Sequence, residues 1–187
     1  MNFDPPTRGI VFQDIEVRRL QAGATHLVRL VRRAPIGESW YPEPFRTRDP
    51  LTGKRYSHRW RTRLDETRSI YFKSPFGKPG DSMYVREAWS DDGHYRADGG
   101  VHKFQPGTTM PLANARYIIQ IHDLSIRRVH SLDRDDMVAE DPLFGRGGVP
   151  WTDEYRKDFE DRVGFHCWSS NPWVYVIKYK AIPAHGN

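Results

Sequence analysis

Short stretches in which apolar and polar positions alternate recur along this chain and predict β-strands, because strand side chains point in turn to opposite faces. In the last stretch Tyr175, Ile177 and Tyr179 alternate with Val174 and Val176, so both faces of that strand are apolar. The predicted strands cover residues 9–12, 26–33, 83–89, 94–98, 115–123, 124–129 and 173–180.

Three segments have helical signals. Asp14 is placed to cap a helix over 15–22, and Gly23 suits the left-handed residue that follows its end. Ser131 is the expected N-cap of a short helix that reaches Glu140 and stops at Asp141-Pro142. A further helix over 152–163 has a buried stripe with a four-residue repeat, which indicates packing rather than a cofactor site. Its members are Trp151, Tyr155, Phe159 and Val163.

Residues 34–75 differ from the rest, because they are rich in Pro, Arg and Thr and have no steady period. With a turn at 49–53, they are predicted to form a loop or a hairpin insertion. Several short strands with two or three helices predict an α+β domain built on a small β-barrel. We therefore expect one domain over 1–187 with a loop-rich basic insertion at about 34–75.

Composition and the absence of certain segments indicate where in the cell the protein is expected. Cys167 is the only cysteine, so no internal disulfide can form and a Cys-based zinc site is excluded. No apolar run approaches the roughly 18 residues that span a membrane. The first residues lack a basic region followed by an apolar one, as a signal peptide would have. The expected location is the cytoplasm, with no membrane partner.

The net charge of +5 weakly favours polyanionic partners, and its local distribution says more. Basic and aromatic residues interleave in the insertion, a combination that suits phosphate contact with base stacking. The alternative is a solvated insertion whose arginines pair with acids of the C-terminal half. The residues concerned are Arg46, Arg48, Lys54, Arg55, Arg59, Arg61, Arg63, Arg68 and Lys73, with Phe45, Tyr56, Trp60, Tyr71 and Phe72.

Glu87 stands out, because the alternation places it on the same strand face as Met83, Val85 and Trp89. A carboxylate among apolar neighbours must find a partner or shift its pKa. Glu87 is therefore either a site residue or the partner of a structural arginine, for which Arg86 or Arg29 is available.

Several common chemistries have no signal here. The chain has no P-loop, no GxGxxG and no GxSxG motif. The eight histidines lack HxxxH and HExxH spacing, so neither a metal nor a cofactor is expected. Cys167, next to Trp168, is better explained as buried than as a nucleophile. Glu140 and Glu87 remain the best candidates for acid/base work.

Ordered segments over most of the chain resemble the ASCH domains of the PUA-like superfamily, in particular members from phages and prophages. The insertion at 34–75 lies outside this resemblance. The segments are Val11-Phe12 with Leu20-Gln-Ala-Gly23, Phe76-Gly-Lys-Pro-Gly-Asp81 with Val85-Arg-Glu-Ala-Trp89, Tyr95-Arg-Ala-Asp98, Met110-Pro111, Ser131-Leu to Ala139-Glu140, and Asn171-Pro-Trp-Val-Tyr-Val-Ile177.

The resemblance implies a PUA-like barrel whose cleft suits a nucleobase or RNA. Some small bacterial members deacylate acetylcytidine with a Lys, a Thr and a Glu, and others are linked to RNA cleavage. Here Thr25 stands at the Lys position and Val28 at the Thr position, whereas Glu140 and Arg29 match. Catalysis would then need His26 as general base, with Thr25 assisting.

The favoured hypothesis is binding of nucleic acid, RNA in the first place, or of a modified nucleotide. The cleft would lie between the 26–29 segment, the Glu87 strand and the Glu140 helix. Trp89 or Trp168 would stack on a base, and Glu87 or Glu140 would accept hydrogen bonds from an exocyclic amine. The expected phosphate contacts are Arg29, Arg55, Arg59 and Arg61, and Arg86 is a further candidate for nucleic-acid or ligand binding.

Two alternatives remain open. The first is a nucleoside amidohydrolase or ribonuclease in which Glu140 is the acid/base. The second is a phage protein that binds a host protein through the 34–75 insertion, whose aromatic residues would then matter more than its charges.

Overall fold

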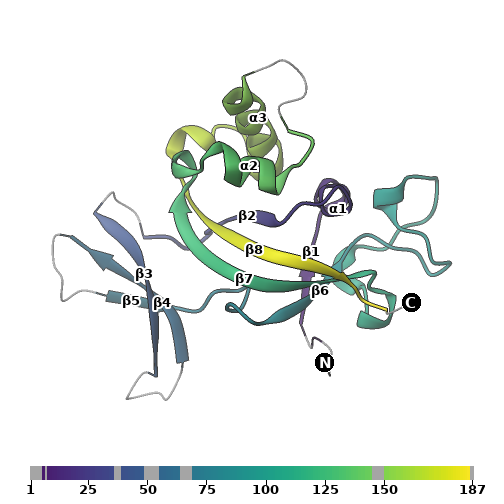
Figure 1. Ribbon diagram of the computed structural model, residues 1–187, viewed down its shortest axis with the longest axis horizontal. Coiled ribbons are helices and arrows are strands. Elements are labelled where there is room, and N and C mark those ends of the chain that lie inside the picture. Colours follow the sequence, from purple (N-terminus) through teal and green to yellow (C-terminus); the bar gives the residue numbers. More distant parts are fainter. Residues whose placement is uncertain are drawn as a thin grey trace.

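The computed structural model describes residues 6, 8–35, 39–48, 55–63, 69–144 and 150–185. Within them the chain forms a five-stranded mixed sheet, a separate three-stranded antiparallel sheet and three α-helices (Figure 1). In spatial order the large sheet consists of β1 (Gly9–Val11), β6 (Ser82–Arg86), β7 (Tyr117–Arg128), β8 (Trp173–Pro183) and β2 (His26–Leu30). The helices are α1 (Asp14–Gln21), α2 (Arg134–Glu140) and α3 (Trp151–Val163).

The α+β class is confirmed, but the prediction of a closed barrel is wrong. Within the described residues β1 and β2 are the two edges of the large sheet and do not pair with each other. β1 has only three residues, and the chain turns from it almost directly into α1, so the ladder goes no further. A side chain crosses the gap instead: Arg29 of β2 donates a hydrogen bond to the Val11 carbonyl at 2.8 Å.

Both faces of the large sheet are covered, as the apolar alternation of the last strand predicted. Val174 and Val176 of β8 pack with α2 and α3. Tyr175, Ile177 and Tyr179 point to the other face and join the main core with residues of α1, β1 and β6. The α3 stripe is confirmed, since Tyr155 and Phe159 are buried, with Trp151 and Val163 packed beside them.

The 34–75 insertion supplies the whole small sheet, which lies to one side of the large one in Figure 1. Its strands are β3 (Trp40–Arg48), β4 (Arg55–Thr62) and β5 (Ser69–Phe72). Trp60 is 1% exposed. Its ring stacks on Phe72 at 5.3 Å and meets Trp173 of β8 at 5.4 Å, so the insertion shares the main core.

Several element boundaries differ from the sequence prediction. Asp14 is the first residue of α1, and Gln13 is the N-cap in a capping box with Glu16. Asp133, not Ser131, caps α2, because its carboxylate accepts the Asp136 N–H. The turn expected after α1 is confirmed, with Gly23 at a φ of 97°.

The segment between β6 and β7 differs most. The strand predicted over 83–89 ends at Arg86, and residues 94–98 form a single bridge at Tyr95 followed by a 3-10 turn. Trp89 pairs by isolated bridges with both Tyr95 and Gln105. The two strands predicted over 115–129 are one continuous strand, β7, with a register irregularity between Ile121 and Asp123.

Candidate functional site

Glu140 ends α2 and is 2% exposed. Its carboxylate accepts the Tyr155 O–H at 2.6 Å, the Val28 backbone N–H at 3.1 Å and the Arg162 guanidinium at 2.9 Å. Burial, followed by the charge of Glu140, raises the pKa of Tyr155, so this phenol remains protonated and donates. The carboxylate is thus held on three sides by buried groups, which favours a structural role over proton transfer.

Thr25 and His26 lie beside the same end of α2, as the resemblance implies. The Thr25 N–H donates to the Ala139 carbonyl at 2.8 Å, and its hydroxyl lies 3.0 Å from His26 Nδ1. Partial burial lowers the pKa of His26, and the neighbouring charge of Lys178 lowers it further. His26 is therefore neutral near pH 7, in the form that can accept a proton.

Arg29 is engaged inside the fold. Its guanidinium forms a two-pronged ion pair with Glu16 of α1, in addition to its bond to the Val11 carbonyl. Glu16 is 2% exposed, and the Arg29 guanidinium also lies 5.9 Å from the centre of the Phe12 ring. These contacts connect β2 to α1 and β1. Arg29, which was expected to contact phosphate, therefore has a structural role.

Glu87 is fully buried, and its partner is Arg116 rather than Arg86 or Arg29. The Arg116 guanidinium donates to both carboxylate oxygens, at 3.0 and 2.6 Å, and stacks on the Tyr95 ring at 3.9 Å. Burial raises the pKa of Glu87, and the hydrogen bonds and charge of Arg116 oppose that rise. This pair joins the end of β6 to the start of β7.

The other predicted binding residues are packed to different degrees. Trp89 is 8% exposed, which leaves little ring surface for stacking on a base. Arg86 donates to the Gly107 carbonyl at 3.1 Å. Trp168 is half-buried and packs edge-on against Tyr155 and Phe159. The structure thus brings Glu140 near Thr25 and His26, whereas Glu87 and Trp89 lie in a separate cluster around Met110.

Among the described side chains of the small sheet, two arginines of β4 lie on one face. Along β4, His58, Trp60 and Thr62 are buried, whereas Arg59 and Arg61 point the other way and are each 22% exposed. Residues directly opposite across a ladder share a face. Here Tyr41 lies opposite Arg61, and both Glu43 and Tyr71 lie opposite Arg59. We call these five residues (Tyr41, Glu43, Arg59, Arg61 and Tyr71) the arginine face.

Glu43 lies between the two arginines of this face. Its carboxylate accepts the Arg59 Nε–H and lies 3.8 Å from Arg61 Nη1. Arg63, just after β4, adds a third guanidinium, 5.9 Å from the centre of the Tyr41 ring. The predicted site residue Arg55 begins β4, and its side chain lies outside the described residues, as do Arg46, Arg48, Lys54 and Arg68.

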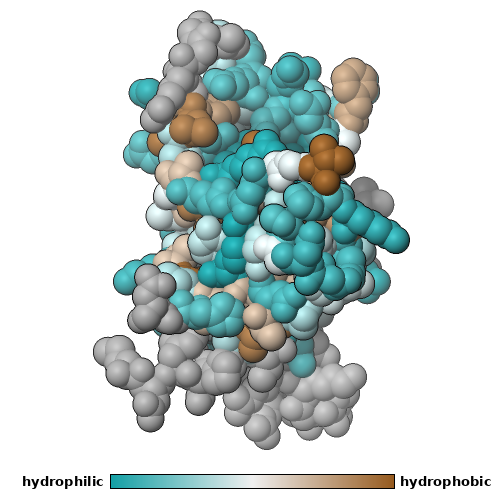
Figure 2. Space-filling model, turned by 90° about the vertical axis from the view of Figure 1, so that its right-hand side faces the viewer, coloured by the Kyte–Doolittle hydropathy of each residue, from teal (hydrophilic) through white to brown (hydrophobic). Residues whose placement is uncertain are grey.

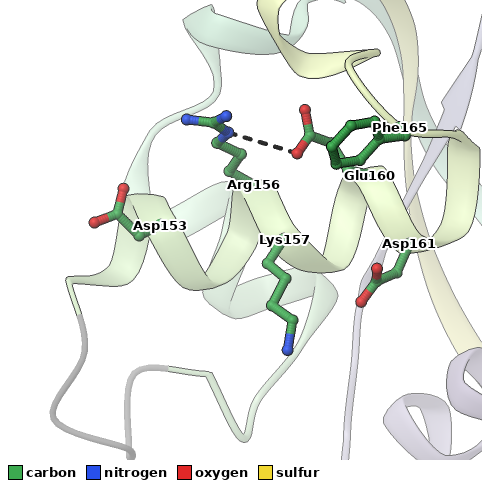
Figure 3. A pocket seen from close by; sticks show the side chains of 6 residues that line it. All are labelled: Asp153, Arg156, Lys157, Glu160, Asp161 and Phe165. Atoms are coloured by element: carbon green, nitrogen blue, oxygen red, sulfur yellow. Dashed lines mark ion pairs between the residues drawn. The ribbon is translucent and has the colours of Figure 1, made fainter.

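A separate open groove of about 390 Å³ lies on the exposed side of α3 (Figure 3). Arg156 reaches Glu160 across it, and the exposed Phe165 ring lies beside Glu160. None of the residues lining it was predicted from the sequence as a site residue. They are Asp153, Arg156, Lys157, Glu160, Asp161 and Phe165.

Comparison of the chain with protein-family models, with curated proteins and with solved structures found no match to any of them. The ASCH-like motifs therefore rest on the sequence alone. Among the described residues, no helix is both long and apolar enough to cross a bilayer.

The sequence did not predict the arginines that pair with the two candidate glutamates. Arg116 and Arg162 each neutralise a buried glutamate, yet each lies more than twenty positions along the chain from it. Glu43 and Tyr41 were missed on the arginine face because the insertion has no steady period. The short alternation of Arg59 and Arg61 with Trp60 could have indicated a strand with one arginine-bearing face. No local signal gives the register that sets Tyr41 and Glu43 opposite these arginines.

Proposed function

We propose that this chain is a PUA-like module that binds nucleic acid, RNA in the first place, and that the arginine face makes the contact. The single observation that carries the proposal is the alignment of Arg59 and Arg61 on one face of β4, opposite Tyr41 and Tyr71. Guanidinium groups neutralise phosphates, and tyrosine rings stack on unpaired bases.

Binding is better supported than catalysis at Glu140. A catalytic carboxylate must reach a reacting atom, and the Glu140 carboxylate is enclosed by Tyr155, Arg162 and the Val28 N–H. The arginine face, by contrast, is partly exposed and carries its charge on the side turned away from the core.

The test is fluorescence anisotropy with labelled single- and double-stranded RNA and DNA at about 50 and about 200 mM salt. The wild type is expected to bind single-stranded RNA in a salt-sensitive manner. The double variant Arg59→Gln/Arg61→Gln should bind single-stranded RNA more weakly. It should also reduce the slope of log K against log salt by about 1.4, because two phosphate contacts to a single strand are lost.

The matched control is Arg134→Gln/Arg156→Gln, which removes the same charge from α2 and α3. If both double variants weaken binding equally, net charge and not the arginine face is responsible. If the wild type binds none of the probes, the proposal fails. A partner protein that binds the insertion would then be the next hypothesis. Binding that retains its affinity at high salt would distinguish such a protein interface from phosphate contact.

A further inference from the structure

The segment between β6 and β7 projects from the large sheet on the side away from the small sheet (Figure 1). The face on which it lies is mainly hydrophilic, with a few scattered apolar residues (Figure 2). On this segment three side chains with metal-ligand atoms come together: Asp92, His94 and His102. The nearest ligand atoms of all three lie within 4.8 Å of one another.

The geometry is close to that of a metal-binding triad. His102 Nδ1 lies 3.4 Å and His94 Nε2 lies 3.9 Å from the same carboxylate oxygen, Oδ2 of Asp92. Zinc–ligand bonds of about 2.0–2.1 Å place tetrahedral ligand atoms about 3.3 Å apart. The first separation is close to this value. For the second, the exposed His94 ring must turn out of its stacked position against His102, so that both imidazole nitrogens point at one ion.

The backbone that carries Asp92 and His94 is held in a hydrogen-bonded turn. Ser90 closes the turn that carries Asp92 and His94, since its N–H donates to the His94 carbonyl at 2.9 Å and its Oγ accepts the His94 N–H at 3.1 Å. The Ser90 hydroxyl also donates to Oδ1 of Asp92, so Oδ2 is the oxygen left facing the two histidines. A hydrogen bond that orients a ligand in this way is usual around protein-bound metals.

The other end of the segment is pinned as well. Gln105 exchanges backbone hydrogen bonds with Trp89 at 3.2 and 2.6 Å, and its side chain donates to Asp91 at 2.9 Å. A side chain at Gly100 would meet the His102 ring at 3.1 Å, so a glycine there lets the chain pass close to the ligand. The His94 and His102 rings lie stacked, with their centres 3.8 Å apart. Because a metal ion bonds in the plane of an imidazole, one ring must tilt out of this stack when the ion binds.

We propose that Asp92, His94 and His102 form a binding site for a divalent transition-metal ion, Zn²⁺ in the first place, with an open fourth position. Two imidazoles and one carboxylate favour Zn²⁺ and its neighbours over Mg²⁺ or Ca²⁺, which prefer oxygen ligands. The sequence predicted no metal site, because a spacing of two and then eight residues matches none of the usual histidine motifs. The fold closes that spacing by joining Trp89 to Gln105.

The test is Zn²⁺ titration of the full chain, stripped with a chelator, against a chromophoric competitor. One Zn²⁺ per chain is expected, without competition from excess Mg²⁺. His94→Ala and His102→Ala should each lower the affinity at least about tenfold. The control is His122→Ala, which removes an exposed histidine of β7 and should leave the affinity unchanged.

A second measurement reports on the ligands directly. Loading with Co²⁺ should give the intense visible absorption of a tetrahedral site, and the band should be lost in His94→Ala/His102→Ala. Circular dichroism checks that each variant is folded, which is expected because all three residues are exposed. The proposal is overturned if the wild type binds Zn²⁺ no better than this double variant, or if His122→Ala lowers the affinity as much as His94→Ala.

Discussion

Buried carboxylates in this protein come with an arginine. Glu16, Glu87 and Glu140 are each at most 2% exposed, and they pair with Arg29, Arg116 and Arg162 respectively. Removing one member of such a pair leaves an uncompensated charge in the interior, which costs far more than an exposed ion pair contributes. The residues predicted as catalytic or ligand-binding acids are therefore also points on which the stability of the fold depends.

Glu140→Gln is expected to lower the free energy of unfolding by about 2 kcal/mol, because the Arg162 guanidinium, 7% exposed, then keeps only Asp158 of its two carboxylate partners. The measurement is equilibrium unfolding in urea. The control is Asp161→Asn, an exposed acid on α3 next to Arg162, for which a change within about 0.5 kcal/mol is expected. Equal stability of Glu140→Gln and wild type would contradict this account and would reopen a catalytic role.

His58 gives the small sheet a dependence on pH. Burial lowers the pKa of His58 below its ordinary value of 6.5. The unfolded chain then binds more protons than the folded one as the pH falls through 6.5, so acidification lowers the free energy of unfolding. His58→Gln should remove this part of the loss between about pH 7 and about pH 5.5. The control is His122→Gln, which replaces an exposed histidine. If His58→Gln and His122→Gln lose the same free energy of unfolding over this pH range, His58 does not contribute.

At the scale of elements, the arginine face carries an acid in the middle of its positive charge. Glu43 of β3 pairs with Arg59 and lies near Arg61, so it offsets part of the charge that would meet a phosphate. Removing the Glu43 charge should therefore change nucleic-acid binding if the arginine face makes the contact.

Glu43→Gln should strengthen nucleic-acid binding and increase its salt dependence, because it removes the charge that competes with phosphate for both arginines. Anisotropy with the same RNA probe measures the effect. Asp135→Gln, at an exposed position of α2, is the control for the change in net charge. Weaker binding by Glu43→Gln would mean that Glu43 holds the arginines in a required geometry, and would contradict simple competition.

The elements that could be predicted from the sequence are those with a local signal. The four-residue stripe of α3 and the two-sided alternation of β8 each follow from one short segment, and both are confirmed. Closure of the sheet depends instead on whether distant edges meet. Between the two edge strands, β1 and β2, the connection is the Arg29 side chain and not a backbone ladder.

The surroundings of Glu140 could also be predicted only in part. Glu140 lies beside the segment that begins at Thr25, because its carboxylate accepts the Val28 N–H. What the sequence could not give is the partner of each buried acid. A helical pattern places Arg162 on α3, but only the packing of α3 against α2 brings it to Glu140.

At the scale of the whole molecule, the insertion is joined to the large sheet by aromatic packing. Trp60 of β4 contacts Phe72 of β5 and Trp173 of β8, and it belongs to the same core as Tyr175 and Ile177. A tryptophan shared in this way couples the stability of one sheet to that of the other. We therefore expect both sheets to unfold in a single cooperative transition.

Trp60→Ala should lower the free energy of unfolding of the whole chain by about 3–5 kcal/mol, because it leaves a cavity between the two sheets. Amide hydrogen exchange followed separately in β4 and β8 should show the same loss in both strands. Tyr71→Ala is the matched control, since Tyr71 lies on the arginine face of the small sheet and is 45% exposed, so its removal leaves no cavity. Loss of protection in β4 alone, with β8 unchanged, would show that the insertion folds independently of the large sheet.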